Sequence, residues 1–487
     1  MPWRPLNREQ AWMLPPTLDE LMPADHPARF VAEFVDALGS EEWAELGVKI
    51  DGEPLGAPGY HPRALLSVWL YGFMSGVRSS RKLEAACRDQ VPYLWLTGRQ
   101  HPDHNTLWRF YAQHRRAMRT LFDRTVRTAV AMDLVDLAVQ AVDGTKVGAN
   151  ASLRRTRDTA ALGRLTERLE QAIDDLEAQG EAGTDAVPAR LPQQLASQQA
   201  LRARVREAME ELAERPELRR INLTDPEARL MKTPHGIVPG YNAQAMVSPA
   251  GTDRGSGGML VTAAEVVDAP VDNEQLAPML ERARETTGMA ATLTLADAGY
   301  HSGRALEACE RREQRVVMPE ARQRLLEHPY HKDRFRYEAE HDHYICPEGQ
   351  PLRFLHTIPR PAGRLRVYRS SGAVCGACPA FGVCTNTPHG RSVAIGRRDA
   401  VLRRHREWMT TAEAKAAYRR RAALVEPVFG ILKEELGARR FLLRGLPNVA
   451  AEWTVLATAF NLRTLWRAWR TGRRLHWSSG LASQPAG

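Results

Sequence analysis

Three acidic residues lie in segments where acidic side chains are uncommon. Asp143 lies in the middle of the apolar, β-prone run 137–150, and Asp297 ends a second apolar run and precedes Ala-Gly-Tyr. Glu426 is expected on the apolar face of an amphipathic helix over residues 424–433. Because burial of an unpaired carboxylate is costly, each of these residues usually requires a partner such as a metal ion. Three carboxylates on three separate elements supply the hard oxygen ligands that a pair of Mg²⁺ ions requires for phosphoryl transfer.

The order and surroundings of these residues resemble those of the DDE transposases of bacterial insertion sequences, whose catalytic domain has the RNase H-like fold. In that family the first Asp lies within a strand, the second follows another strand, and the Glu lies on a later helix. The chain is most similar to the branch with a Tyr, Arg, Glu, Lys signature, here Tyr418, Arg421, Glu426 and Lys433, with one additional residue between the Arg and the Glu. The resemblance extends from about residue 12 to about residue 466.

This resemblance implies a DNA transposase that cleaves and transfers strands by two-metal phosphoryl transfer. The three carboxylates would hold two Mg²⁺ or Mn²⁺ ions, and the Tyr, Arg and Lys of the signature would contact DNA. The implied partners are double-stranded DNA, namely the terminal inverted repeats of the element and its target, and a second copy of the chain in a synaptic homodimer. Two alternatives are another RNase H-like nuclease, such as a resolvase, and a DNA-binding repressor derived from a transposase. The intact trio of carboxylates disfavours the repressor.

The spacing around Glu426 predicts how its neighbours are arranged if one helix continues through all of them. Lys433 follows by seven residues, so it would project from the same helix face about 10 Å further along the axis, over the DNA strand. Tyr418 would lie near this face, whereas Arg421 would be rotated away by more than a right angle. Arg421 would then need a bend near Pro427 or a long reach. The alternative for Lys433 is a solvated surface lysine.

Length and charge restrict the class of protein. A chain of 487 residues is expected to form two or more domains, or one domain with large insertions. The net charge of +9 favours a polyanionic partner, although 60 of the 67 basic residues are Arg, as GC-rich codon usage also produces. Because the chain has no apolar run of membrane-spanning length and its start lacks a signal-peptide pattern, we expect a cytoplasmic, nucleoid-associated protein with no membrane partner.

Residues 1–130 are predicted to form a separate all-α domain. Apolar residues recur at three- and four-residue spacing over 29–38, 63–73, 80–96 and 106–130. Asp103 or Asn105 could cap a basic helix that carries Arg109, and this helix with the one before it suits a helix-turn-helix that binds DNA. The alternative is a helical bundle with a solvated basic face.

The catalytic core is predicted to be an α/β domain with a mixed five-stranded sheet, formed by residues 131–150, 221–318 and 405–470. The Asp143 strand should lie centrally beside the Asp297 strand and pair with antiparallel strands at 244–248 and 258–266. A helix over 272–287 would be capped by Asp272 or Asn273, and a C-terminal helix is expected over 448–466. This succession is the one that an RNase H-like core requires.

Two insertions and a tail complete the prediction. Leucines at helical spacing predict a helical hairpin over 151–220, which would be structural and could form a dimer contact. Residues 319–404 are expected to be β-rich, and residues 471–487 to form a flexible tail. Cys-Pro-Glu-Gly and Cys-x2-Cys-Pro in the second insertion resemble zinc knuckles, so a structural Zn²⁺ is predicted at Cys346, Cys375, Cys378 and Cys384. The alternative is four reduced or oxidisable thiols, and Cys87 and Cys309 are expected in helical cores.

Overall fold

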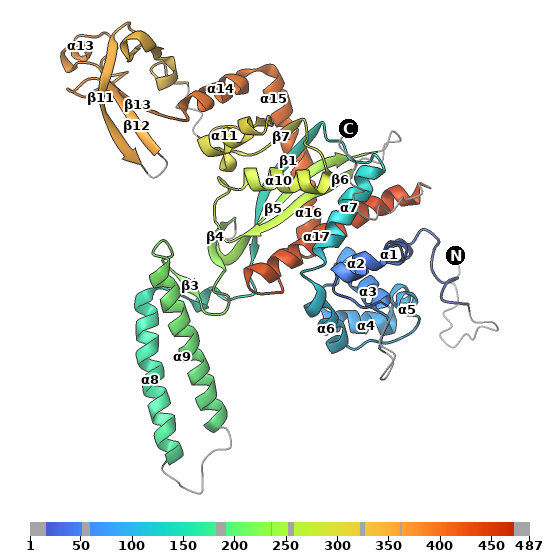
Figure 1. Cartoon of the computed structure of the whole chain (residues 1–487). Helices are drawn as coiled ribbons and strands as arrows, with labels where there is room; N and C mark the ends of the chain where they lie inside the picture. Colours follow the sequence, from blue (N-terminus) through green and yellow to red (C-terminus); the bar gives the residue numbers. More distant parts are fainter. Residues whose placement is uncertain are drawn as a thin grey trace, which may run out of the picture.

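The computed structural model describes residues 16–50, 59–181, 191–234, 236–251, 258–321, 327–360 and 363–471. Its fold is mixed α/β. Figure 1 shows a central sheet with helices on both faces, a group of N-terminal helices packed beside it, and two segments that project away from it. None of the described helices combines the length and the apolar character that a membrane span needs.

The central sheet is organised around β1 (Val139–Gly148). Antiparallel to β1 is β5 (Gly236–Ala250), which also pairs with β6 (Gly258–Val267). On the other side of β1 are two parallel neighbours, β7 (Leu293–Leu295) and then β8 (Arg315–Val317). The predicted pairings of the two aspartate strands and of the two antiparallel strands are therefore confirmed.

The sheet has six strands, so the prediction of five was wrong. The additional strand is β4 (Arg229–Thr233), which pairs with the first residues of β5. The long strand β5 begins at Gly236, whereas its pairing with β1 begins at Gly240. Because the unpaired backbone groups of this overhang need partners, the preceding segment folds back onto them through a tight turn in which Gly236 has a φ of 111°.

Alternating residues of β1 are buried against two different helical layers. Val142 faces α10 (Leu276–Thr287) and α11 (Gly303–Arg311), whereas Ala141 faces the layer that contains α17 (Leu446–Arg470). This period-two burial is the pattern that a strand covered on both faces requires. The buried apolar side chains of α17 include the four that were predicted from helical spacing: Trp453, Leu456, Phe460 and Leu465.

The N-terminal helices of the described residues are α1 (Pro27–Asp36), α2 (Ser40–Glu45), α3 (Pro62–Met74), α4 (Ser80–Asp89), α5 (Val91–Leu96), α6 (His104–His114) and α7 (Arg119–Ala131). The predicted helix over 80–96 is broken at Gln90, which is extended and caps a new helix that has Pro92 in its first turn. The predicted helix over 106–130 is likewise divided between α6 and α7. Periodicity alone could not show these breaks, since apolar spacing continues across them.

The N-terminal helices are joined to the rest of the chain through α17. This helix packs against α3, α7 and β6. At this contact Arg78 forms a buried ion pair with Glu452 on α17, with 2.8 Å between Nη1 and Oε1. Arg78 also donates to the backbone carbonyls of Gly437 and Arg440. A buried charge is tolerated when it is paired and hydrogen-bonded in this way.

The first projecting segment is a helical hairpin of α8 (Thr159–Glu181) and α9 (Leu191–Glu214). Its base is closed by the short antiparallel strands β2 (Thr156–Arg157) and β3 (Ile221–Asn222). The predicted leucine seam is present, since Leu162, Leu169, Val205 and Leu212 form a buried cluster. The predicted break after Gly180 begins no earlier than residue 182, and residues 182–190 lie outside the described part of the chain.

The second projecting segment contains the predicted β-rich insertion. It is a five-stranded antiparallel sheet with the strands β9 (Arg336–Glu338), β10 (His343–Ile345), β11 (Pro351–Arg360), β12 (Gly363–Arg369) and β13 (Ser392–Gly396) in sequential order. A short helix, α13 (Gly372–Gly376), follows β12. The chain then returns to the core through α14 (Asp399–Thr410), α15 (Ala412–Arg419) and α16 (Arg421–Gly430). Residues 472–487 of the predicted tail lie outside the described residues.

Candidate active site

Asp143 lies in the middle of β1, opposite Ala245 of β5. Its carboxylate is one-fifth exposed and accepts a hydrogen bond from the backbone N–H of Gly144 at 2.9 Å. A Cβ on Gly144 would lie 2.3 Å from the Gln244 amide nitrogen and 2.6 Å from the Asp272 carboxylate. Only glycine leaves room for this close packing, which explains why the Asp is followed by Gly.

Asp297 lies just beyond the end of β7, the strand parallel to β1. Its side chain caps a single 3₁₀ turn, η2 (Ala298–Tyr300), by accepting a hydrogen bond from the backbone N–H of Gly299 at 2.8 Å. Because β1 and β7 are adjacent and parallel, this cap holds the Asp297 carboxylate on the same side of the sheet as Asp143.

Arg421 connects the two aspartates. Its guanidinium donates to Asp143 at 3.3 Å and lies 3.9 Å from the Asp297 carboxylate. The chain ends α15 at Arg419 and starts α16 at Arg421, so a continuous helix from Tyr418 is broken at Arg420. Arg421 and Glu426 nevertheless share α16, and the predicted rotation between them is observed: Arg421 contacts the aspartates, whereas Glu426 is exposed.

The electrostatic environment of Asp143 combines opposing effects. Burial is the main cause that raises its pKa to about 6, and the nearby charges of Asp297 and Asp272 act in the same direction. The positive charge of Arg421 lowers the pKa. The three carboxylates are accompanied by Arg421 and by Lys146, which lies 3.5 Å from Asp272, so an excess of one negative charge remains and favours a further cation.

Asp272 is a third aspartate of this site, and the sequence analysis assigned it only a possible capping role. Helix α10 begins later, at Leu276, and Asp272 instead accepts hydrogen bonds from the side-chain amides of Asn242 at 2.6 Å and Gln244 at 2.7 Å. Gln244 also accepts a hydrogen bond from the buried hydroxyl of Tyr300. Polar residues at alternate positions of β5, 242 and 244, were the signal that could have indicated this network.

Glu426 lies on α16, which packs against β1 and β5 through Leu424, Val425, Val428 and Phe429. Contrary to the expected place on the apolar face, Glu426 itself is exposed. Among the described residues, the one group of His, Cys, Asp or Glu whose ligand atoms all lie within 4.8 Å of one another is Glu338, His341 and His343. The ligand atoms of Asp143, Asp297 and Glu426 therefore do not all lie within 4.8 Å of one another.

The Glu338, His341 and His343 group was not predicted. It belongs to the insertion sheet, where Glu338 and His343 are cross-strand neighbours of β9 and β10. The Nε2 atom of His343 lies 3.0 Å from the Glu338 carboxylate. A His-x-His pair just after an acidic strand residue was the sequence signal. This group lies in a separate sheet from the aspartates.

The remaining residues of the signature are distributed around the site. Lys433 lies in a π-helical turn, η5 (Ile431–Glu435), so the regular α-helical spacing from Glu426 does not hold. It is half-buried, and burial lowers its pKa while the Asp143 charge raises it. Tyr418 is half-buried on α15 and lines a cleft with His301, which follows Asp297 closely in the chain.

Arg109 lies on α6, in the N-terminal part of the chain. Of the two predicted caps of this helix, Asp103 is the one present: its carboxylate accepts hydrogen bonds from the backbone N–H groups of Asn105 at 2.8 Å and Thr106 at 3.1 Å. Arg109 and the neighbouring Trp108 are exposed. The short helix α5 lies between α4 and α6, within the segment that was predicted as the helix over 80–96.

The four cysteines of the insertion line one small cavity. The backbone N–H of Gln350 donates to Cys346 Sγ and that of Arg391 donates to Cys375 Sγ, both at 3.3 Å. Burial raises the pKa of Cys384, and the sulfurs of the other three cysteines raise it further, because all four are close together. Cys87 and Cys309 are buried in helical cores, as predicted.

The donor types of the two clusters suit different metals. Carboxylate oxygens, as at Asp143 and Asp297, are the preferred ligands of Mg²⁺ and Mn²⁺. Four thiols held by N–H···S hydrogen bonds are the ligand type of structural Zn²⁺. Both sets therefore match the predicted metals in donor type, although in neither set do three ligand atoms all lie within 4.8 Å of one another.

Comparison with known families supplies an independent result. The model described as "Transposase DDE domain" matches residues 345–466, and the model described as "Transposase domain (DUF772)" matches residues 16–113. The first match contains Glu426 and the four clustered cysteines, and the second contains Arg109; Asp143 and Asp297 lie outside both. No curated protein and no solved structure matches the chain. Transposase domains matched towards both ends of the chain support an insertion-sequence DDE transposase.

Proposed function

We propose that this chain binds the ends of an insertion sequence and catalyses metal-dependent cleavage and transfer of DNA strands. The observation that carries this proposal is the pair of aspartates on adjacent parallel strands, bridged by Arg421, in a chain of the transposase family. The order of strands around β1, with α16 packed against it, supports an RNase H-like core.

In the proposed mechanism Asp143, Asp297 and Glu426 hold two divalent cations, Mg²⁺ or Mn²⁺. Such a pair supplies activation of the attacking water or 3′-hydroxyl and stabilisation of the leaving oxygen. Asp143 must be deprotonated to act as a ligand, and Arg421 favours that state by lowering its pKa. Lys433, half-buried beside Asp143, contacts a phosphate of the bound strand.

Other parts of the chain support this function. We propose that the N-terminal helices, within residues 1–130, bind the terminal inverted repeats through the exposed face of α6 with Arg109 and Trp108. The active form would be a homodimer on paired ends, with the helical hairpin within residues 151–220 as a contact. The β-rich insertion within residues 319–404 would be stabilised by one structural Zn²⁺. With DNA as its substrate, the protein would act in the cytoplasm at the nucleoid.

The experiment that tests this function uses duplex DNA taken from the sequences that flank the gene, incubated with the full-length protein and Mg²⁺ or Mn²⁺. We expect cleavage at the element end and joining of the free 3′ end to a second duplex. The variants Asp143→Asn, Asp297→Asn and Glu426→Gln should bind the end but not cleave it, because each keeps its shape and loses the ligand charge.

Each alternative predicts a different result. Cleavage without joining would indicate a resolvase-like nuclease, and specific binding without cleavage by the wild-type protein would indicate a repressor. Wild-type cleavage by any one of the three variants would remove that residue from the active site.

A further inference from the structure

Two clefts open beside the aspartates, and each is bounded by a different projecting segment. The first, here named the insertion cleft, is lined by Asn273 and Ser302 on the core and by β11 and β12 of the insertion. The second, here named the hairpin cleft, runs from Gly144 past β4 and β5 to the base of the helical hairpin. Figure 1 shows the two projecting segments with the central sheet between them. Asn273 of the first cleft follows Asp272, and Gly144 of the second follows Asp143, so the aspartates adjoin both clefts.

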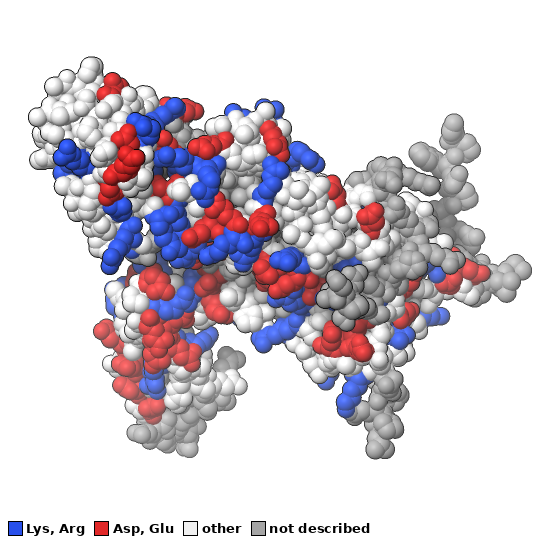
Figure 2. All heavy atoms as spheres, turned by 45° about the horizontal axis from the view of Figure 1, so that its top comes forward, with Lys and Arg blue, Asp and Glu red and all other residues white. Residues whose placement is uncertain are grey.

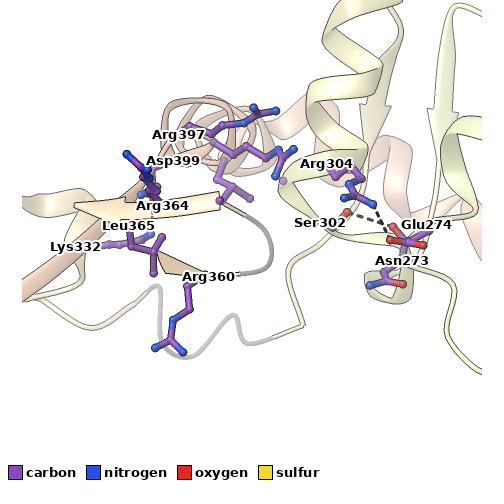
Figure 3. A pocket seen from close by; sticks show the side chains of 15 residues that line it. Asn273, Glu274, Ser302, Arg304, Lys332, Arg360, Arg364, Leu365, Arg397 and Asp399 are labelled. Carbon is purple, nitrogen blue, oxygen red and sulfur yellow. Dashed lines mark hydrogen bonds and ion pairs between the residues drawn. The ribbon is translucent and has the colours of Figure 1, made fainter. Parts of the chain in front are cut away.

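The insertion cleft carries an excess of positive charge. Figure 3 shows Arg304 on the core side and Arg360, Arg364 and Arg397 on the insertion side. Arg304 is paired with Glu274 at 2.9 Å, and Arg397 lies 3.2 Å from Glu307. Arg360 and Arg364 are exposed at the end of β11 and the start of β12, and neither has an ion pair with an acidic residue in the described part of the chain.

The hairpin cleft is larger, with a volume of about 970 Å³, and it is also basic. Its cationic side chains come from β1, the base of the hairpin, β4, η5 and the segment after η5. They are Lys146, Arg155, Lys232 and Lys433 together with three arginines of the segment after η5, Arg439, Arg440 and Arg444. None of the described residues that line this cleft is acidic. Arg155 and Lys232 are exposed, the first at the base of the hairpin and the second on β4.

The space-filling view is consistent with this arrangement. Figure 2 shows Lys and Arg side chains gathered on the face between the insertion and the helical hairpin, with acidic side chains interspersed. A long polyanion binds a row of cationic groups because each phosphate that is neutralised releases counterions. A row of cations that passes the carboxylates on two sides suits a nucleic acid strand with its reacting phosphate in the middle.

We propose, on the basis of the function proposed above, that the DNA strand carrying the scissile phosphate lies across the carboxylates, from the insertion cleft to the hairpin cleft. Arg360 and Arg364 then bind phosphates on one side of the cut, and Arg155 and Lys232 bind phosphates on the other side. Both projecting segments are therefore DNA-binding elements, and each reads a different side of the cleavage position.

The test uses two double variants of the full-length chain, Arg360→Ala with Arg364→Ala and Arg155→Ala with Lys232→Ala. The matched control is Arg284→Ala with Arg311→Ala, which removes two exposed arginines that line neither cleft. Asp143→Asn is added to all, so binding to the element end is measured without cleavage. Each cleft variant should bind about tenfold or more weakly and lower the log-log salt slope by about two, whereas the control should be unchanged.

Uncharged methylphosphonate linkages then locate the contacts. In the control protein, a single methylphosphonate on either side of the cut should weaken binding. For each cleft variant, a methylphosphonate on one side of the cut should no longer weaken binding, because the phosphate contact on that side is already removed. The affected side should differ between the two variants. Loss on the same side, or on neither side, would overturn the proposed path.

Two further outcomes separate this proposal from others. If the cleft variants lose self-association in sedimentation but keep their DNA contacts, the clefts bind a second copy of the chain and the path is wrong. If protein without any substitution in the two clefts binds no element end, the proposed function itself fails. If the two variants lose phosphate contacts on opposite sides of the cut but the wild-type protein never cleaves DNA, the path is kept and the proposed catalysis is rejected.

Discussion

Arg421 donates a hydrogen bond to Asp143 at 3.3 Å, from the first turn of a helix that begins at Arg421 itself. The contact couples the protonation of Asp143 to the positive charge of Arg421. Burial and two neighbouring carboxylates raise the pKa of Asp143 to about 6, and Arg421 opposes them. At neutral pH the aspartate is therefore ionised but close to its titration range.

Replacing Arg421 with Gln should move the pH dependence of cleavage to higher pH. Without the positive charge the pKa of Asp143 rises, so more alkaline conditions are needed to ionise it for metal binding. The acid limb of the pH–rate profile should shift upward by about one unit. Single-turnover cleavage between pH 5.5 and 9 measures this. Arg421→Lys, which retains the charge, should shift less, and an identical shift in both variants would contradict the electrostatic explanation.

The insertion should contain about one Zn²⁺ per chain, bound by its four cysteines. Changing Cys375 or Cys378 to Ser should remove this zinc, because structural sites bind through thiolates. Metal analysis of protein made with zinc present provides the measurement. His341→Asn serves as the control, since zinc lost in that variant and kept in the cysteine variants would assign the metal to the Glu338, His341 and His343 group instead. Absence of zinc from the wild-type protein would refute the prediction.

Lys433→Ala should weaken binding to the cleaved element end and lower the log-log salt slope by about one. The reason is that a half-buried lysine close to Asp143 loses one phosphate contact. Titration of labelled DNA across a salt series measures both quantities. Arg284→Ala, which removes one distant exposed charge, is the matched control. An unchanged slope with unchanged end joining would show that Lys433 is only a surface charge.

Acid should destabilise the protein partly through His301 and His405, whose rings lie 5.8 Å apart. Burial lowers the pKa of both side chains below the usual 6.5, so folding favours their neutral forms. As the pH falls below 6.5 the unfolded chain binds more protons, and the free energy of unfolding decreases.

His405→Gln should therefore be less stable than the wild type at pH 7.5, by roughly 1–2 kcal/mol, because the imidazole packing is lost. The difference should narrow as the pH is lowered to 5, since the variant has one fewer histidine to protonate. Thermal unfolding at several pH values tests this. A constant difference would show that folding leaves the pKa of His405 unchanged, and a widening difference would show that folding raises it.

The sequence predicted the elements whose signals are local. Apolar runs interrupted by Asp143 and by Asp297 indicated strands with functional carboxylates, and these strands are adjacent and parallel in the structure. Helical spacing predicted α17 and the leucine seam of the hairpin. The two cysteine motifs predicted residues that do converge on one cavity, although they are separated by the strands β11 and β12.

Features that depend on tertiary contacts were not predicted. The segment between Tyr418 and Glu426 has good helical composition, so the break at Arg420 could not be seen. The contact of Arg421, rather than Glu426, with the aspartates depends on how α16 packs against β1. Asp272 resembles a helix cap in the sequence, and only the fold brings it to Asn242 and Gln244. The exposed position of Glu426 and the extra strand β4 depend likewise on how the elements pack.

Helix α17 has a consequence for how the chain is made. It fills the interface between the N-terminal helices and the sheet, and its Glu452 neutralises the buried Arg78. During synthesis the N-terminal helices leave the ribosome long before this partner exists, with a delay on the order of tens of seconds. Until then Arg78 lacks its ion-pair partner, and the sides of α3 and α7 that pack against α17 are exposed to solvent. We therefore expect a nonsense or frameshift mutation before α17 to leave a destabilised N-terminal fragment that competes poorly with the intact protein for DNA.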